Sequence, residues 1–285
     1  MEDSNMFTVT PMSQVLELKP GDTYEGSITV VNPDNAKSDF LYKTEISAYG
    51  VVGEGYDADL VTSTEHTQIT KWITIKNPTG AVKPNESVKI NFTIQVPETA
   101  PAGGQYAAIL ISSADTGNVS DGLAVKNIFE MASLIYVGIN SDKTDRKGEI
   151  LKNDVPGFVT GMPIVVSAEV NNEGDVHEIA KVALKVKSVF SPNQIYPSEG
   201  ESGIIEEVIM PDSTRVMSRN IDGISSLGIY DVTQTITYRG TVSTTHKIVI
   251  ACPIWFLVLF ILTVSAIIFS IVKSIKKHRH KKEVF

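Results

Sequence analysis

The chain has 285 residues, with 25 Lys and Arg against 33 Asp and Glu, a single cysteine and a formal net charge of −8. Its mean hydropathy is +0.04 and its pI is near 5.2. An acidic body without a basic stripe argues against nucleic-acid binding, and one cysteine excludes a disulfide framework and a Cys-based metal site.

Residues 7–139 alternate between apolar and polar positions, with Pro, Gly, Asn and Asp at the breaks. This period of two predicts strands, and the absence of amphipathic helices between them favours a β-sandwich. Lys19-Pro20-Gly21 and Lys83-Pro84-Asn85 are tight-turn signals before two of the strands. We therefore predict a first immunoglobulin-like sandwich over 6–140, with strands at 7–10, 14–18, 24–31, 40–49, 70–75, 88–96, 106–112 and 128–139.

Aromatic side chains are the candidate binding residues of this module. Strand alternation over 70–75 places Trp72 on the polar face, with Thr70 and Thr74, where an indole can stack on a sugar ring or contact a protein. Packing of Trp72 in the core is the alternative reading, and an edge strand that takes up a partner strand is a third. The candidate binding residues are Trp72, Tyr42, Tyr49, Tyr56 and Tyr106, of which Tyr42, Tyr49 and Tyr56 are expected on a half-exposed surface.

Signals for catalysis or metal binding are weak. The acidic loop from Glu54 to Asp59 has carboxylates that calcium accepts, but a solvated hairpin tip is the preferred interpretation. The five histidines lack the His-x-x-x-His spacing of a metal site, and Gly223–Gly228 lacks the Gly-x-Ser-x-Gly spacing of a nucleophile elbow. The sequence predicts no enzyme, no metal and no cofactor.

A polar stretch over 140–148 separates the first module from a second predicted sandwich over 149–245. Its predicted strands are 164–170, 181–190, 203–210, 215–220, 229–238 and 242–249. This module echoes the first: Asn32 and Asn171 each end an apolar strand, and Gly104-Gln105-Tyr106 has a counterpart in Gly228-Ile229-Tyr230. The chain is therefore predicted to be all-β, with two tandem immunoglobulin-like β-sandwiches of about 100 residues each.

The 25 residues Ile248–Val272 contain no charged side chain and predict one transmembrane α-helix. The tail 273–285 has six basic residues and one acid, formally +5, while the 247 residues before the helix have 19 basic and 32 acidic residues, formally −13. A basic flank predicts a cytoplasmic C-terminus and an extracellular body on a single-pass plasma-membrane protein. An acidic body should favour neutral sugar, peptide or protein surfaces over polyanions.

An exported body needs a leader, and residues 1–20 contain no apolar region of signal-peptide length. Two arrangements follow. Either the leader has been removed, or the protein is tail-anchored with its body in the cytosol.

Several motifs resemble the bacterial WxL-interacting protein family. They are Phe7–Pro11, Leu18–Gly21, Val31-Asn32-Pro33, and Val96-Pro97 leading to Ala102–Tyr106, on a plan of two sandwich modules, a C-terminal helix and a basic tail. The resemblance implies that the first module binds peptidoglycan and the second binds host or partner proteins.

Our leading hypothesis is a non-enzymatic, membrane-anchored bacterial cell-surface protein that functions in binding or adhesion. Its partners are the lipid bilayer, through Ile248–Val272, and a cell-wall polymer or surface proteins. The alternatives are a tail-anchored cytosolic adaptor with a peptide-binding sandwich, and a surface hydrolase with carboxylates across a cleft.

Overall fold

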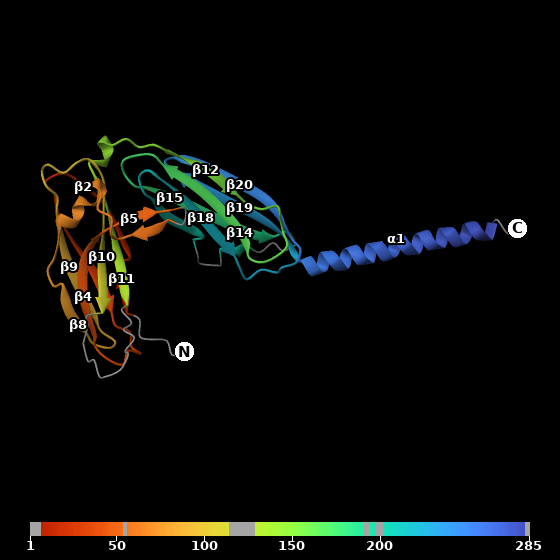
Figure 1. Cartoon of the computed structure of the whole chain (residues 1–285), viewed down its shortest axis with the longest axis horizontal. Coiled ribbons are helices and arrows are strands. Elements are labelled where there is room, and N and C mark those ends of the chain that lie inside the picture. The colour runs from red at the N-terminus through yellow and green to blue at the C-terminus, as the bar shows by residue number, and fades with distance from the viewer. Residues whose placement is uncertain (1–6, 54–55, 114–128, 191–193, 198–201, 283–285) are drawn as a thin grey trace. The chain divides into compact units, whose positions relative to one another are not determined.

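The computed structural model describes residues 7–53, 56–113, 129–190, 194–197 and 202–282. The chain is built from largely antiparallel β-sheets followed by one long C-terminal helix (Figure 1). The predicted fold class, two immunoglobulin-like sandwiches and an apolar helix, is confirmed.

The first sandwich has two sheets, ordered β1-β3-β9-β7 and β2-β11-β10-β4-β8. The chain switches sheets between β1, which pairs antiparallel with β3, and β2, which pairs parallel with β11. A small hairpin, β5-β6, lies outside these sheets. The elements are β1 (Thr8–Thr10), β2 (Ser13–Leu18), β3 (Thr23–Val31), β4 (Phe40–Ala48), β5 (Gly50–Val52), β6 (Asp57–Asp59), η1 (Glu65–Lys71), β7 (Ile73–Ile75), β8 (Thr79–Val82), β9 (Ser87–Gln95), β10 (Gly103–Ser113), β11 (Glu130–Ile139) and η2 (Ser141–Lys143).

The core of this sandwich follows the period of two. Along β9, Ile90, Phe92 and Ile94 are buried while Lys89 and Asn91 are exposed. The apolar side chains of β9 pack with those of the facing sheet, because successive side chains of a strand point to opposite faces. β10 is different, since nearly all of its residues are buried, as expected for a central strand covered on both faces.

The second sandwich repeats the plan of the first. Its sheets are ordered β12-β14-β18 and β13-β20-β19-β15-β16, with β17 also paired to β15. Here β13 pairs parallel with β20, as β2 does with β11. The strands are β12 (Gly148–Asp154), β13 (Phe158–Val159), β14 (Ile164–Asn172), β15 (Glu178–Ser188), β16 (Gln194–Tyr196), β17 (Ile204–Ile209), β18 (Ser213–Ile221), β19 (Gly228–Tyr238) and β20 (Thr241–Ala251).

The contacts divide the chain into two compact units. Unit 1 is Met1–Glu149 with the segments Asn171–Glu178 and Val208–Arg215. Unit 2 is Ile150–Val170, Ile179–Glu207 and Val216–Phe285. The functional boundaries predicted from the sequence, 6–140 and 149–245, stay a prediction.

The predicted start of the apolar helix is wrong. Residues 248–251 belong to β20, and helix α1 runs from Ile254 to Lys282. β20 is held in register with β19 up to Ala251, and Pro253 stands just before the first helical residue. Within the described residues, α1 is the one helix that is long and apolar enough to cross a membrane, over Ile254–Lys273 with mean hydropathy 2.7.

The strand predicted at 70–75 is also wrong in its first half. Residues Glu65–Lys71 form a 3-10 helix, η1, and only Ile73–Ile75 are extended. Thr64 caps η1: its hydroxyl accepts a hydrogen bond from the His66 N–H, and the Thr67 hydroxyl in turn accepts the Thr64 N–H. A capped turn thus replaces the strand alternation on which the placement of Trp72 was based.

Candidate functional site

A surface pocket of about 400 Å³ in unit 1 is the candidate binding site. Three short segments line it: the end of β2, the Lys19–Asp22 turn, and the stretch around η2. Five of its lining residues are charged, and both signs of charge are present. The lining residues are Glu17, Leu18, Lys19, Asp22, Asn140, Ser141, Asp142 and Arg146.

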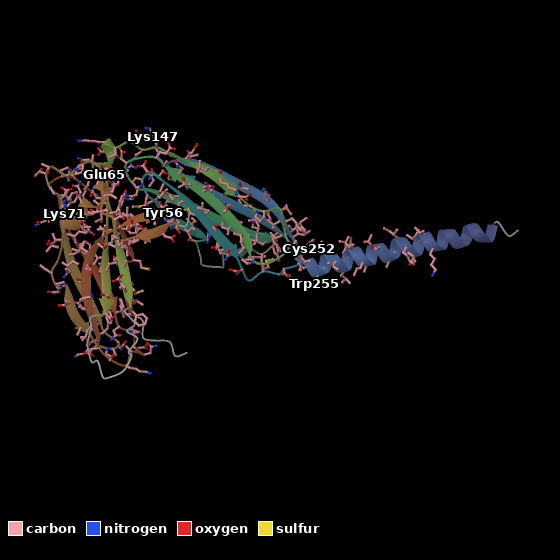
Figure 2. All side chains as sticks on the ribbon, in the orientation of Figure 1. Tyr56, Glu65, Lys71, Lys147, Cys252 and Trp255 are labelled. Carbon is pink, nitrogen blue, oxygen red and sulfur yellow. The ribbon has the colours of Figure 1, made fainter. Side chains whose placement is uncertain are left out.

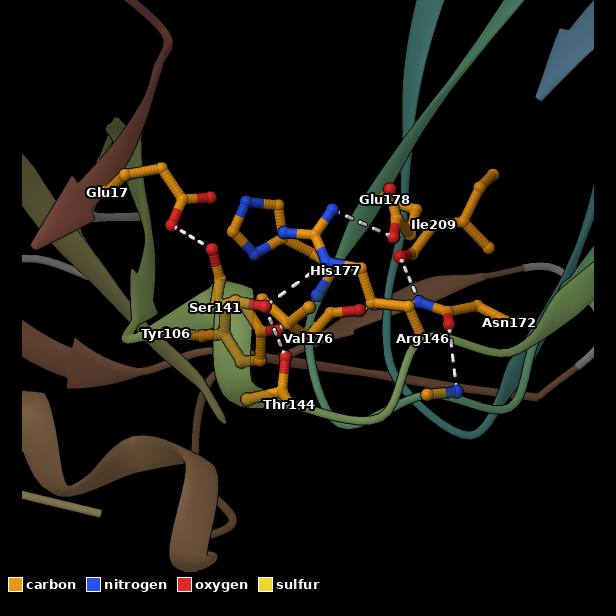
Figure 3. A network of polar contacts seen from close by, with 11 residues as sticks. Glu17, Tyr106, Ser141, Thr144, Arg146, Asn172, Val176, His177, Glu178 and Ile209 are labelled. Carbon is orange, nitrogen blue, oxygen red and sulfur yellow. Dashed lines mark hydrogen bonds and ion pairs between the residues drawn. The ribbon is translucent and has the colours of Figure 1, made fainter. Parts of the chain in front are cut away.

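Two charged side chains of the pocket are held by hydrogen bonds (Figure 3). Glu17 accepts a hydrogen bond from the Ser141 hydroxyl. The Arg146 Nε donates to the Ser141 backbone oxygen over 3.2 Å, and its Nη1 lies 3.2 Å from the Glu178 Oε1. Ser141 therefore links a carboxylate and a guanidinium, which fixes both groups at the pocket wall.

The remaining charges of the pocket are exposed. Lys19 and Asp142 are exposed, and neither forms an ion pair with any residue that the structure describes. Asp22 accepts the backbone N–H of Lys19 over 2.8 Å, which closes the Pro-Gly turn. An exposed ammonium and an exposed carboxylate in one pocket suit a polar ligand that is neutral or zwitterionic.

A buried cluster of tyrosines also belongs to unit 1. Tyr106 and Tyr136 pack edge to face, with ring centroids 6.0 Å apart, and Tyr136 donates a hydrogen bond to the Tyr49 hydroxyl over 3.2 Å. The Tyr56 hydroxyl accepts the Met210 N–H over 2.5 Å, and the Arg215 guanidinium lies 4.6 Å from the centre of its ring. Burial raises the pKa of Tyr56, Tyr106 and Tyr136, so these phenols stay protonated.

His177 completes this cluster. Its side chain is buried, its ring centroid lies 5.6 Å from that of Tyr106 and 5.6 Å from that of Tyr136, and its Nδ1 has no hydrogen-bond partner among the described residues. The Tyr106 hydroxyl accepts the backbone N–H of His177 over 2.9 Å. Burial, with a smaller contribution from Arg146, lowers the pKa of His177 to about 4. The imidazole is therefore neutral at pH 7.

The structure separates the five aromatic residues predicted from the sequence. Tyr49, Tyr56 and Tyr106 come together in the tyrosine cluster, whereas Tyr42 and Trp72 pack in the core of the first sandwich. The expected half-exposed surface is wrong for Tyr42 and Tyr49, which are 3% and 7% exposed, because both point to packed faces of the sheet. Trp72 is 9% exposed, in agreement with the core-packing alternative.

Sequence reasoning did not identify the pocket. The stretch 140–148 reads as a polar linker, and nothing in its spacing links Ser141 or Arg146 to Glu17, which lies 124 residues before Ser141. The Lys19-Pro20-Gly21-Asp22 turn is the one sequence feature that belongs to the pocket wall, but as a tight-turn signal it predicts only local structure.

Metal binding has no support in the described part of the chain, where no group of three or more His, Cys, Asp or Glu side chains could hold an ion. Two residues of the acidic loop, 54 and 55, lie outside the described residues. Asp59 is bonded locally: its carboxylate accepts the N–H groups of Val61 and Thr62, and hydrogen bonds from Thr62 lower its pKa.

Comparison with known proteins gives neither a family nor a curated relative, since no family model and no curated protein matches the chain. Among solved structures, the E. coli chaperone DraB matches with 12% identity over 85% of this chain and 98% of that chain, at a TM-score of 0.40. The class 5 fimbriae chaperone CfaA matches with 14% identity over 85% and 99%, at 0.39. A complex of the Salmonella enterica SafA pilin with the SafB chaperone matches with 12% identity over 87% and 98%, at 0.42. At such TM-scores these likenesses carry no conclusion about function.

Proposed function

We propose that this protein is a non-enzymatic, membrane-anchored binding protein of a bacterial cell surface. The pocket of unit 1 binds a neutral or zwitterionic polar ligand, of the kind that peptidoglycan presents in its amino sugars and stem peptides. The apolar helix α1 crosses the plasma membrane, and the basic tail lies in the cytoplasm.

The pocket is the observation that carries this proposal. Its wall holds Glu17 and Arg146 in fixed positions through Ser141, and Lys19 and Asp142 stand exposed beside them. Fixed donors and acceptors reduce the side-chain entropy that is lost when a ligand binds. Hydroxyl, amide, ammonium and carboxylate groups can all find a partner there.

Membrane anchoring would compensate for a low affinity of the pocket. A shallow polar site gives modest affinity, because its groups exchange hydrogen bonds with water. Confinement to the membrane raises the effective concentration of the site next to the wall, so that weak contacts add up.

Cosedimentation with purified peptidoglycan sacculi tests the proposal. The full chain in detergent should pellet with sacculi, and serum albumin should not. Lys19→Ala with Asp142→Ala should reduce the pelleted fraction several-fold, because both exposed charges of the pocket are removed. The matched control, Lys71→Ala with Asp57→Ala, removes one cation and one anion from exposed positions elsewhere and should pellet like the wild type.

Two results would count against wall binding. One is a pelleted fraction no larger than that of albumin. The other is an equal loss in the pocket variant and in the control, which would assign the sedimentation to overall charge.

A partner protein is a second candidate ligand, and the edge strand β2 favours it. β2 lies at the edge of its sheet, and Met12 and Val15 on or beside it are 66% and 42% exposed. An exposed edge can take up a strand from a partner. Val15→Lys should abolish such binding in a pull-down of surface proteins and leave sedimentation with sacculi unchanged.

A further inference from the structure

One end of the larger sheet in unit 2 has an apolar outer face. Phe158 on β13 stands opposite Ile250 on β20, and Ile250 stands opposite Ile229 on β19. At the end of β15, Val189 donates its N–H to the Ile229 oxygen over 2.9 Å and extends the line to a fourth strand. We call these four residues, Phe158, Val189, Ile229 and Ile250, the apolar row.

The apolar row lies on the outer face of the sheet. Val249, the neighbour of Ile250 along β20, is fully buried, so Ile250 points away from the core. Phe158, Val189 and Ile250 are 51%, 49% and 44% exposed. Single exposed apolar residues are ordinary on a protein surface, but a row across four strands is not.

Further along β20 and β19, most of this face is polar. Following β20 away from Ile250 on the same face, Ile248 is still apolar, but His246 and Thr244 are polar, and His246 contacts the Asp231 carboxylate over 2.6 Å. β19 contributes threonines at 233, 235 and 237. Two loop residues at the apolar end, Phe190 and Leu227, are 79% and 44% exposed and enlarge the apolar surface there.

Chain connectivity places the apolar row next to the start of α1. β20 ends at Ala251 and α1 begins at Ile254, so that only Cys252 and Pro253 intervene. Figure 2 shows Cys252 and Trp255 together at this junction. Trp255 is 64% exposed, and the five residue steps from Ile250 to Trp255 span at most about 18 Å.

We propose that the apolar row, with Phe190 and Leu227, inserts into the interfacial layer of the bilayer that α1 crosses, so that this end of unit 2 is seated on the membrane. The inference rests on the proposed function, because it requires α1 to span that bilayer. A tryptophan near the end of a membrane helix marks the level of the headgroups. The apolar row lies within reach of that level and offers the aromatic and aliphatic side chains that enter this layer.

The basic residues next to the apolar row are suited to contact anionic lipid headgroups. Lys187 stands opposite Asp231, one position back from the row, and the exposed Lys185 follows two residues further along β15. The acid opposite Lys187, Asp231, contacts His246. Two lysines at headgroup level attract anionic lipid, which favours a bilayer over an apolar protein partner.

Depth-dependent quenching in nanodiscs tests this seating. The full chain with Cys252→Ser is given a single new cysteine that carries an NBD fluorophore. In three separate variants, this cysteine is Ser226→Cys beside the apolar row, Thr241→Cys at the opposite end of β20, or Phe260→Cys in α1. The nanodiscs contain phosphatidylcholine, a minority of phosphatidylglycerol and a lipid with a nitroxide at a shallow or deep acyl position. The shallow nitroxide should quench the label at 226 several-fold more than the label at 241.

A pair of variants shows whether the row is responsible. Phe158→Ser with Ile250→Ser should reduce quenching at 226 to the level seen at 241. The control Val242→Ser removes an apolar residue that is 60% exposed at the far end of the same strand face, and it should leave the quenching at 226 unchanged.

The label at 260 separates this inference from the proposed function. Deep quenching at 260 with equal, weak quenching at 226 and 241 would overturn the seating and keep the membrane anchor. An absence of deep quenching at 260 would overturn both. Quenching at 226 that survives the Phe158→Ser and Ile250→Ser changes would also overturn the role of the row.

Discussion

His177 is a buried neutral base, and its depressed pKa makes stability depend on pH. The unfolded chain has an ordinary histidine pKa near 6.5, whereas burial lowers the folded value to about 4. As the pH falls from 6.5 toward 4, the unfolded state takes up a proton that the folded state refuses, so folding stability decreases over that interval. The largest loss is about 3 kcal/mol.

Thermal unfolding of the full chain in detergent, followed from pH 7.5 to 4.5, measures this effect. His177→Phe keeps an aromatic ring beside Tyr106 and Tyr136 but cannot titrate. Its transition should therefore fall less with decreasing pH than that of the wild type. Parallel pH curves for the two proteins would show that other groups cause the acid sensitivity.

Gly104 and Gly228 allow a tyrosine two residues later to lean back over the strand. A Cβ on Gly104 would lie 1.8 Å from the Tyr106 hydroxyl, and one on Gly228 would lie 2.7 Å from the Tyr230 hydroxyl. Gly104→Ala should destabilise the protein by about 1–3 kcal/mol through overpacking, and by more than Gly228→Ala. Gly157→Ala, which meets no atom within 4 Å, is the control. Equal unfolding midpoints for Gly104→Ala and Gly157→Ala would contradict this account.

The sequence showed the Gly-x-Tyr repeat but not its partners. Tyr230 donates its hydroxyl to the Ser225 oxygen five residues upstream, a local bond typical of a tyrosine corner. Tyr106 instead accepts the N–H of His177, which lies 71 residues away. Only the tertiary fold determines which of these partners a tyrosine meets.

A buried asparagine follows or ends the third strand of each sandwich and donates to two backbone oxygens. After β3, the Asn32 Nδ2 donates to the Ser38 and Val82 oxygens over 3.0 and 2.9 Å. At the end of β14, the Asn172 Nδ2 donates to the Val176 and Ile209 oxygens, each over 2.9 Å. The sequence repeat predicts Asn171 as the counterpart of Asn32. The hydrogen bonds show that the counterpart of Asn32 is Asn172.

Replacing either asparagine should lower the free energy of unfolding. Asn172→Leu removes the amide donor from two buried carbonyl groups, and Asn32→Leu removes it from one buried and one part-buried carbonyl, at about 1–3 kcal/mol for each buried group. Asn171→Leu is the matched control. Asn171 is the sequence neighbour of Asn172, and among the described residues its side chain donates a hydrogen bond only to the Thr214 hydroxyl. Urea unfolding of the full chain measures the difference, and equal midpoints for the 171 and 172 variants would refute this role of Asn172.

Strand periodicity predicted most elements to within a few residues and failed where a local signal competed. Over 70–75 the alternation of Ile and Thr indicated a strand, but the Thr64 cap and the Gln105 side chain hold η1 in place: Gln105 donates to the Glu65 oxygen and accepts the Ile69 N–H. At the other end, apolar residues 248–251 fit a helix and a strand equally, and the ladder with β19 decides for the strand.

The molecule as a whole joins an acidic two-sandwich body to one apolar helix and a basic tail. If α1 is an anchor, the full chain should resist extraction from membranes by alkaline carbonate, and a chain ending at Cys252, which keeps β20 and lacks α1, should be released. Proteolysis of intact cells should remove the body and spare the tail. A protected body would support the cytosolic adaptor instead.

Composition and periodicity were sufficient for the architecture because both reflect averages over many residues. The sandwich class, the repeat of its plan and the apolar helix all follow from such averages. The pocket depends on four or five particular side chains brought together from residues 17–22 and 140–146. No average over the sequence identifies it.

The eleven residue pairs between β19 and β20, from Gly228 opposite Ala251 to Tyr238 opposite Thr241, have a mechanical consequence. Under the proposed function, a wall-bound body pulled against a membrane anchor would be loaded through β20, the strand that continues into α1. Tension along the axis of β20 shears this whole ladder at once, so its hydrogen bonds share the load and do not open one after another. β20, which connects the body to α1, is thus hydrogen-bonded to β19 along its whole length, an arrangement that resists tension along the strand.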